Sequence, residues 1–200
     1  MSTSSDLPDQ RVIEKVCDLE LFDAKGKKIK FNTIIAGKKV IVVFIRHFFC
    51  GSCQQYVEQL ASVPKEKLEG ANIGLVVVGC GDWQPITHYA EETGFKGEIY
   101  AEPTRAIYRE LGMISNMGGT PQGEERKSYL KRGPLFNALR SIWRGPLSKP
   151  SLIGKQGNVA QLGGEFVFEP EKKCTFAYRM KHSEDHVEVV DLMKRAGVDL

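Results

Sequence analysis

Two cysteines separated by two residues, Cys50 and Cys53, form the part of the sequence best suited to chemistry. They follow a continuously apolar run, residues 40–45, and precede a segment whose apolar residues have helical spacing. Unpaired backbone N–H groups at the start of a helix stabilise a thiolate, which is the reactive form of cysteine. Arg46 and His47 stand just upstream, where either side chain can add positive charge near the sulfurs. The pattern predicts a redox-active dithiol.

The position of each cysteine predicts its role. We expect Cys50 to occupy the exposed cap of the helix and to attack the substrate, and Cys53, one turn further in, to close a disulfide with it. Two inert core cysteines are the alternative, because free cysteine is often buried. A zinc site would need two more ligands, and the histidines show no paired spacing with another cysteine, so we predict no metal.

The composition is that of one ordinary globular domain. The chain has 200 residues, 42% hydrophobic and 26% charged, with a net charge of +3 that does not favour nucleic-acid binding. The sequence has no apolar run near the roughly 20 residues that span a membrane, and the polar N-terminus lacks the apolar centre of a signal peptide. Five cysteines are an odd number, which argues against a disulfide framework. These features predict a cytoplasmic protein.

Strands and helices alternate along the chain. One strand is predicted within residues 12–22, and further strands over 28–31, 40–45, 73–78, 99–101, 166–168 and 175–179. Helices are predicted over residues 52–68 with a break at Pro64, 85–92, 104–111, 134–144 and 186–195. This order predicts an α/β fold with a mixed central sheet flanked by helices on both faces. We expect residues 1–11 to be a flexible tail and residues 12–200 to be a single domain with an insertion at about 115–160.

Several longer stretches resemble a known family. They are RHFFCGSCQQYVEQL, ETGFKGEIYAEPTRAIYRELGM, QLGGEFVFEP and HSEDH, and the resemblance extends over roughly residues 12–198. The chain resembles the peroxiredoxin-like branch of the AhpC/TSA antioxidant family, which is related to prostamide/prostaglandin F synthase. The resemblance implies a thioredoxin-like fold in its peroxiredoxin-like variant.

The chain departs from the family pattern at the site. If Cys53 is aligned with the attacking cysteine of peroxiredoxins, Arg46 replaces their proline and Cys50 their threonine. Alignment with peroxiredoxins therefore makes Cys53 the attacking cysteine, whereas comparison with thioredoxins makes it Cys50. We choose Cys50. The family's active-site arginine would fall near Gly163. Gly163 and Gly164 either leave room for a larger ligand or form a tight structural turn.

Three other features have open roles. Cys80 ends a predicted strand at the active edge of the sheet and is either a third redox group or a bystander, while Cys17 and Cys174 are expected to be bystanders. Residues 126–149 contain seven basic residues and no acidic one, which fits a helix docked on the core, weak contact with a membrane surface, or a lid. His182, Asp185 and His186 fit either a metal or acid–base role or, as we expect, surface histidines beside a helix cap at Ser183 or Asp185.

The resemblance implies an enzyme, a thiol–disulfide oxidoreductase that reduces a peroxide, lipid hydroperoxide or endoperoxide through Cys50 and Cys53. It would hold no cofactor, and a thioredoxin or glutathione system drawing on NADPH would regenerate the dithiol. The alternative is a non-catalytic redox sensor or interaction module that uses the same cysteine pair as a switch. The residues do not select the substrate, the reductant or the oligomeric state.

Overall fold

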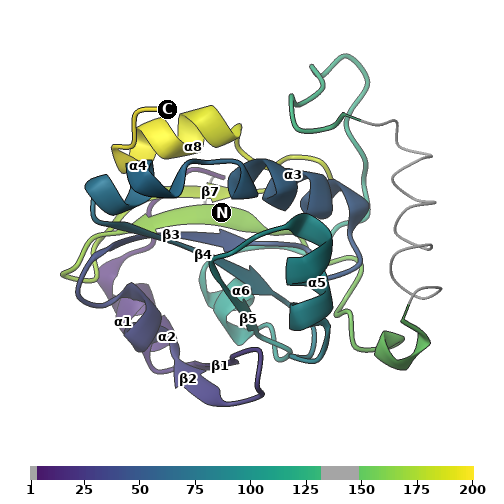
Figure 1. The fold of residues 1–200 in the computed structure, drawn as a ribbon, viewed down its shortest axis with the longest axis horizontal. Helices are drawn as coiled ribbons and strands as arrows, with labels where there is room; N and C mark the ends of the chain where they lie inside the picture. The colour runs from purple at the N-terminus through teal and green to yellow at the C-terminus, as the bar shows by residue number, and fades with distance from the viewer. Residues whose placement is uncertain (1–3, 132–148) are drawn as a thin grey trace.

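The computed structural model describes residues 4–131 and 149–200, which form a seven-stranded sheet with helices on both faces (Figure 1). The strand order is β2-β1-β5-β4-β3-β6-β7. Strands β3, β4 and β5 are parallel to one another, whereas β6, β7, β1 and β2 pair antiparallel with their neighbours, so the sheet is mixed as predicted. The strands are β1 (Glu20–Phe22), β2 (Lys28–Lys30), β3 (Lys39–Phe44), β4 (Ile73–Gly79), β5 (Glu98–Ala101), β6 (Gly164–Phe168) and β7 (Cys174–Arg179).

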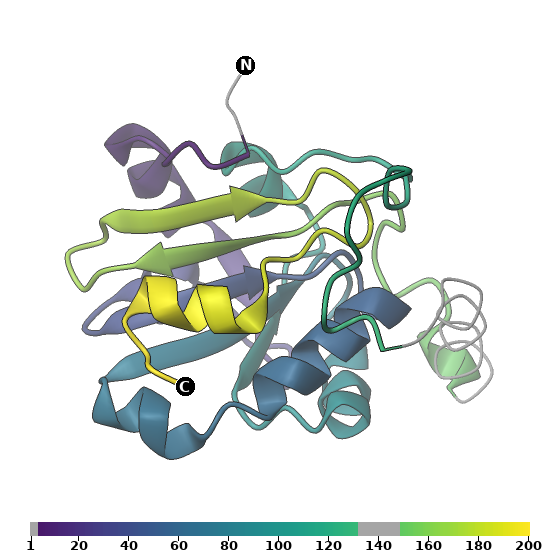
Figure 2. The ribbon, with the colours of Figure 1, turned by 90° about the horizontal axis from the view of Figure 1, so that it is seen from above.

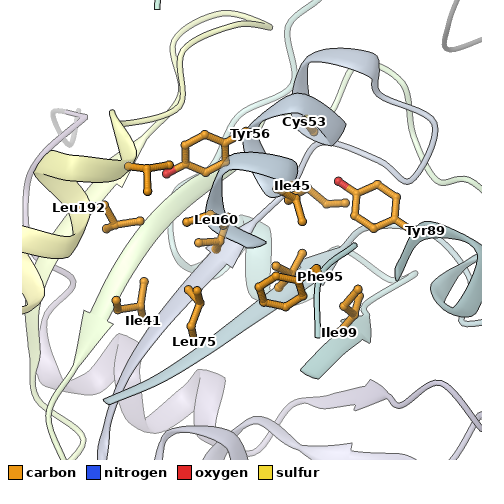
Figure 3. Close-up of a cluster of buried hydrophobic side chains, with 14 of the residues drawn as sticks. Ile41, Ile45, Cys53, Tyr56, Leu60, Leu75, Tyr89, Phe95, Ile99 and Leu192 are labelled. Atoms are coloured by element: carbon orange, nitrogen blue, oxygen red, sulfur yellow. The ribbon is translucent and has the colours of Figure 1, made fainter. Parts of the chain in front are cut away.

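The helices bury two apolar clusters, one on each face of the sheet. One face is covered by α3 (Gly51–Ala61), α4 (Lys65–Gly70), α5 (Pro85–Thr93) and α8 (Val189–Ala196), and the other by α1 (Gln10–Cys17), α2 (Phe31–Ile35) and α6 (Ala106–Glu110). Along β3, Ile41 and Val43 face the first cluster while Val42 and Phe44 face the second. The run is continuously apolar because both faces of this strand are buried. Figure 3 shows Ile41 and Leu75 of the sheet beneath Leu60 and Leu192.

The strand predicted within residues 12–22 is present, but the helix that precedes it was not predicted. Residues 10–17 form α1, and only Glu20–Phe22 is a strand. The buried residues Ile13, Val16 and Cys17 lie at positions i, i+3 and i+4, which share one face of a helix. The Asp9 side chain accepts a hydrogen bond from the backbone N–H of Val12 at 2.9 Å and caps the helix.

The other described elements lie close to their predicted positions. The predicted break at Pro64 is confirmed, since α3 ends at Ala61 and Pro64 caps α4. The helix predicted from Thr104 begins at Ala106, and its N-cap is Arg105, in a left-handed conformation. The last helix begins at Val189 rather than at residue 186.

The two ends of the insertion pair with each other. Ser115 pairs with Gln161 in an antiparallel bridge, and the backbone N–H of Asn116 donates to the carbonyl of Ala160 at 2.7 Å. The helix predicted over residues 134–144, and with it much of the basic segment, lies outside the described residues. A short 3₁₀ helix, η2 (Pro150–Leu152), follows.

The predicted N-terminal tail has contacts of its own. The carbonyl groups of Ser4 and Asp6 each accept a hydrogen bond from Arg179, and α1 already begins at Gln10. Within residues 4–131 and 149–200, no helix is long and apolar enough to cross a membrane.

Candidate redox site

The two cysteines lie where β3 gives way to α3. The end of β3 is held by Tyr108, whose hydroxyl lies 2.9 Å from the carbonyl oxygens of both Ile45 and Val78. Helix α3 begins at Gly51, so Cys50 is its N-cap, as the sequence pattern predicted. The Cys50 sulfur accepts a hydrogen bond from the backbone N–H of Cys53 at 3.4 Å. The sulfur therefore satisfies one of the donors left unpaired at the start of the helix.

Three side chains surround the Cys50 sulfur. The Cys53 thiol donates to it at 2.8 Å, and both cysteines are free thiols. The Arg46 Nη1 donates to it at 3.6 Å, while Nη2 donates to the carbonyl of Val159 at 2.6 Å. The Ser52 hydroxyl lies 3.2 Å away. This is the environment of a stabilised thiolate, because donors and one cation converge on a single sulfur.

The same contacts move the two thiol pKa values apart. Burial opposes the ionisation of Cys50, but the hydrogen bond from Cys53, the Arg46 charge and the Ser52 contact outweigh it and hold the pKa of Cys50 well below its usual value. Burial and the adjacent Cys50 raise the pKa of Cys53 well above its usual value. Cys50 is therefore the more readily ionised thiol of the pair, and Cys53 is the one that keeps its proton.

Arg46 and His47 differ in what they contribute. Burial lowers the pKa of His47, so Arg46 supplies most of the positive charge beside Cys50 and His47 a smaller share. The sequence had allowed either side chain to reach the sulfurs. An arginine is absent from the position before β6 where the family carries one, and the guanidinium beside Cys50 comes instead from the end of β3.

The expectation of an exposed Cys50 was wrong. Its exposed fraction is 3% and that of Cys53 is 0%, whereas Arg46 is only partly buried. The choice of Cys50 as attacker therefore rests on its lowered pKa and not on access.

Gly163 and Gly164 are packed against backbone. A β-carbon on Gly163 would overlap the carbonyl oxygen of Phe44, and one on Gly164 would overlap the carbonyl oxygen of Tyr178. Strands β3, β6 and β7 come together here, and the space left by the absent side chains is filled by protein. Of the two interpretations left open by the sequence, the geometry favours the structural turn.

This packing predicts that Gly163→Ala destabilises the fold by about 1–3 kcal/mol, because the added methyl group must displace a main-chain carbonyl. Denaturant unfolding of wild type and variant measures the difference. Gly119→Ala is the matched control, since nothing lies within 4 Å of a β-carbon there. Equal stability of the Gly163 variant and wild type would contradict the packing argument.

Cys80 contacts the backbone of Arg46. Its thiol donates to the Arg46 carbonyl at 2.8 Å, and burial raises its pKa to about 11. It also lines a cavity of about 260 Å³ together with Arg105 and Lys155. A thiol with this pKa is almost entirely protonated at neutral pH, so these contacts favour the bystander role over a third redox role. Cys17 lies in α1, not in a strand, and Cys174 begins β7.

Sequence reasoning missed a segment that contacts the start of α3. In residues 182–186, the carbonyl of Ser183 accepts a hydrogen bond from the Ser52 hydroxyl at 3.0 Å. His182, Asp185 and His186 are buried, not at the surface as expected. Residue spacing gave no signal for this contact, because Ser183 and Ser52 are 131 positions apart.

His186 belongs to a buried polar cluster under α3. Its Nδ1 lies 2.5 Å from a carboxylate oxygen of Glu165, which is fully buried, and its ring stacks on Tyr56 at 4.2 Å between centroids. The backbone N–H of His186 donates to the Tyr129 hydroxyl at 3.0 Å. The cluster therefore joins β6, α3 and the start of the insertion behind the cysteine pair.

One group in the described part of the chain has donor atoms close enough together to hold a metal ion. Glu124, His182 and Asp185 each offer one atom, all within 4.8 Å of one another. These groups already have partners, since His182 Nε2 lies 3.3 Å from Glu124 and Lys127 lies 3.8 Å from Asp185. The absence of a metal remains a prediction.

Comparisons with known proteins agree on a family. The family model for the AhpC/TSA antioxidant enzyme matches residues 59–182, a stretch that begins after both cysteines. Peroxiredoxin-like 2C of Homo sapiens is 33% identical over 94% of this chain and 82% of its own length. Prostamide/prostaglandin F synthase of Aquarana catesbeiana is 25% identical over 71% of this chain and 65% of its own.

Solved structures show the same fold. Peroxiredoxin 6 of Arenicola marina has a TM-score of 0.62 at 14% identity, covering 96% of this chain and 72% of its own. Peroxidoxin BcpB of Mycobacterium tuberculosis has a TM-score of 0.59 at 14% identity, covering 98% and 96%. The predicted thioredoxin-like fold in its peroxiredoxin-like variant is confirmed.

Proposed function

The chain belongs to the AhpC/TSA antioxidant enzyme family, and from this membership, which supports a redox function, we propose that it is a thiol–disulfide oxidoreductase of peroxiredoxin-like type. The observation that carries the proposal is the geometry at Cys50. Its sulfur has a lowered pKa, receives an arginine N–H, and lies 2.8 Å from a second thiol of raised pKa. A nucleophile and a resolving thiol are thus already adjacent.

The proposed reaction begins at the Cys50 thiolate. The sulfur attacks the terminal oxygen of a hydroperoxide, the O–O bond breaks, and the leaving alkoxide takes up a proton to become an alcohol. The cysteine is then a sulfenic acid. The Cys53 sulfur attacks it, water leaves, and a Cys50–Cys53 disulfide forms. The peroxide gains the two electrons that the two thiols lose.

Arg46 supports this reaction in two ways. Its guanidinium stabilises the thiolate before attack, and its partly exposed position places it where negative charge develops on the peroxide oxygens. His47 is buried near Cys50, and burial lowers its pKa. The helix start adds the backbone N–H of Cys53.

Regeneration of the dithiol needs an external reductant. We propose a thioredoxin or glutathione system linked to NADPH, acting in the cytoplasm by thiol–disulfide exchange without a bound cofactor. The substrate classes proposed are peroxides, lipid hydroperoxides and endoperoxides. Endoperoxides are included because prostamide/prostaglandin F synthases are among the relatives.

A coupled assay tests the proposal. Wild-type protein is supplied with NADPH, thioredoxin, thioredoxin reductase and a panel of hydrogen peroxide, alkyl and lipid hydroperoxides and an endoperoxide, and a second series contains glutathione and glutathione reductase. We expect NADPH consumption well beyond one equivalent per protein with at least one substrate. A single stoichiometric oxidation in every case would contradict the enzyme.

The alternative function, a redox sensor, is favoured by one observation. Both sulfurs are almost fully buried, which suits a pair that responds to oxidation by a change of conformation. The same assay separates the two functions, because a sensor forms its disulfide once and does not turn over.

A further inference from the structure

Tyr89 places a buried hydroxyl near the cysteine pair. Helix α5, which carries it, packs beside α3 on one face of the sheet (Figure 2). In Figure 3 the hydroxyl end of Tyr89 points away from α5, toward Ile45 and the turn of α3 that holds Cys53. The Tyr89 ring packs edge-to-face with Phe48, with the ring centroids 5.5 Å apart. This packing directs the hydroxyl toward the redox site.

The Tyr89 hydroxyl makes no hydrogen bond within residues 4–131 and 149–200. The residue has an exposed fraction of only 2%. A buried polar group without a partner is destabilising, and nearly all such groups in folded proteins have one. Tyr89 is therefore a donor that lacks an acceptor in the described part of the reduced protein, and a later state of the reaction can supply one.

The ionisation of Tyr89 depends on the charge of the cysteines. Burial raises the pKa of Tyr89 well above its usual value, and negative charge on Cys53, Cys50 and Glu58 raises it further. Of these three groups, Cys53 has the largest effect. The hydroxyl therefore keeps its proton at neutral pH and lies within electrostatic reach of the Cys53 sulfur.

In the reduced protein, Cys53 is a poor acceptor for this hydroxyl. Cys53 is a thiol of raised pKa that donates its own proton to the Cys50 sulfur at 2.8 Å. A thiol sulfur is a weak acceptor, whereas a thiolate accepts charge-assisted hydrogen bonds. A strong bond between Tyr89 and Cys53 therefore requires that Cys53 first loses its proton.

The disulfide-forming step requires the same loss. Once a peroxide has converted Cys50 to a sulfenic acid, Cys53 gives up its proton and its sulfur attacks the Cys50 sulfur. The S–S bond forms, the S–O bond breaks, and the oxygen leaves as hydroxide, which takes up a proton to become water. Negative charge is thus present on Cys53 at the start of this step.

We propose that the Tyr89 hydroxyl donates a hydrogen bond to the Cys53 sulfur when that sulfur ionises, and so promotes disulfide formation. Its role complements that of Arg46, which donates an N–H to Cys50. The inference rests on the proposed function for the sequence of steps. The bond between Tyr89 and an ionised Cys53 is independent of any substrate.

Tyr89→Phe removes the hydroxyl and keeps the ring. It also keeps every other ionisable group that interacts electrostatically with Cys53 or Tyr89. These groups lie at the end of β3, in α3 and its cap, in α6 and at the start of the insertion: Arg46, Cys50, Glu58, Tyr108 and Tyr129.

Tyr56→Phe is the matched control. The Tyr56 hydroxyl is also buried and makes no hydrogen bond within the described residues. It lies on α3, one turn after Cys53, but Figure 3 shows it pointing away from Cys53. After burial, the charge that raises the pKa of Tyr56 most is that of Glu165. The control therefore removes an equivalent hydroxyl that faces a different cluster.

The ionisation of Cys53 tests the bond without peroxide. In Cys50→Ser protein, NMR follows the β-carbon chemical shift of isotope-labelled Cys53 against pH, alone and combined with Tyr89→Phe or Tyr56→Phe. Loss of the Tyr89 hydroxyl should raise the pKa of Cys53, so that the thiolate fraction below that pKa falls about three- to tenfold. Tyr56→Phe should leave the titration unchanged. Equal titrations with and without the Tyr89 hydroxyl would overturn the proposal.

Single-turnover kinetics tests the step itself. Reduced protein is mixed with one equivalent of hydrogen peroxide, and peroxide loss, disulfide formation and labelling of the sulfenic acid by a trapping diketone are followed. Tyr89→Phe should consume peroxide at the wild-type rate but form the disulfide about three- to tenfold more slowly, with more sulfenic acid trapped. Wild-type rates of both steps, or a defect confined to peroxide consumption, would contradict the proposal. Failure of wild type to consume peroxide would instead contradict the proposed function, and the Cys53 titration would still decide on the bond.

Discussion

Replacing Cys50 with serine is expected to lower the rate of peroxide reduction by a thousandfold or more, to the background of the assay. A serine hydroxyl at this position stays protonated at neutral pH, whereas the Cys50 thiol is held ionised by Arg46, Cys53 and Ser52. NADPH consumption in the coupled assay measures the loss. The fold should be retained, because serine can still accept the hydrogen bond that caps α3.

Replacing Cys53 with serine should give a different defect. Cys50 can still attack, so one equivalent of peroxide is consumed and the sulfenic acid persists until a trapping diketone labels it. Cys17→Ser serves as control, since Cys17 lies in α1 on the other face of the sheet and should leave turnover unchanged. Normal first-turnover consumption by the Cys50 variant, with loss in the Cys53 variant, would reverse the roles assigned here.

The second large effect is expected at Arg46. Arg46→Gln removes the only charged donor to the Cys50 sulfur among the described residues and should raise the pKa of that thiol. Iodoacetamide alkylation of Cys50 at pH 6 is then expected to slow by about tenfold or more, because an adjacent opposite charge shifts a pKa by roughly one to three units. Peroxide reduction should fall at least as much, since the charge also stabilises the reacting oxygens.

The pH dependence of Cys50 alkylation shows in which direction the loss of Arg46 shifts the pKa of that thiol. A thiol of lowered pKa stays ionised, and so reactive, until the pH falls below that lowered value. Loss of Arg46 moves the alkylation profile toward higher pH, and the two proteins converge where both are fully ionised. Arg46→Lys should preserve most of the reactivity, because the charge remains although the bond to Val159 is lost. Identical profiles for wild type and Arg46→Gln would show that Arg46 does not stabilise the thiolate.

Much of the fold could be predicted from local sequence. The apolar run before Cys50 is a strand buried on both faces, and the residues after it form a helix that stops before Pro64. The helix over residues 10–17 was missed for a local reason. Its buried residues Ile13, Val16 and Cys17 form a pattern too short to separate a helix from a strand, and the cap at Asp9 decides for the helix.

For the candidate site, the sequence predicted the local arrangement of the cysteines but not their burial. The sequence by itself determined that Cys50 and Cys53 share one helical turn at a strand end, since that follows from their spacing and the pattern around them. It also identified Arg46 as a neighbour in the chain. It could not determine exposure, because burial depends on segments far away, and both sulfurs proved to be covered.

Only the tertiary structure decided how the two thiols differ. The lowered pKa of Cys50 depends on where the Arg46 guanidinium points and on which thiol donates to the other, at distances that no spacing specifies. The start of α3 is bonded to Ser183, which lies 131 positions after Ser52 and is itself bonded to Gly118. Local pattern selects helices and strands because their periods are local, whereas the charge and access of a buried sulfur are set by groups that meet only when the chain is folded.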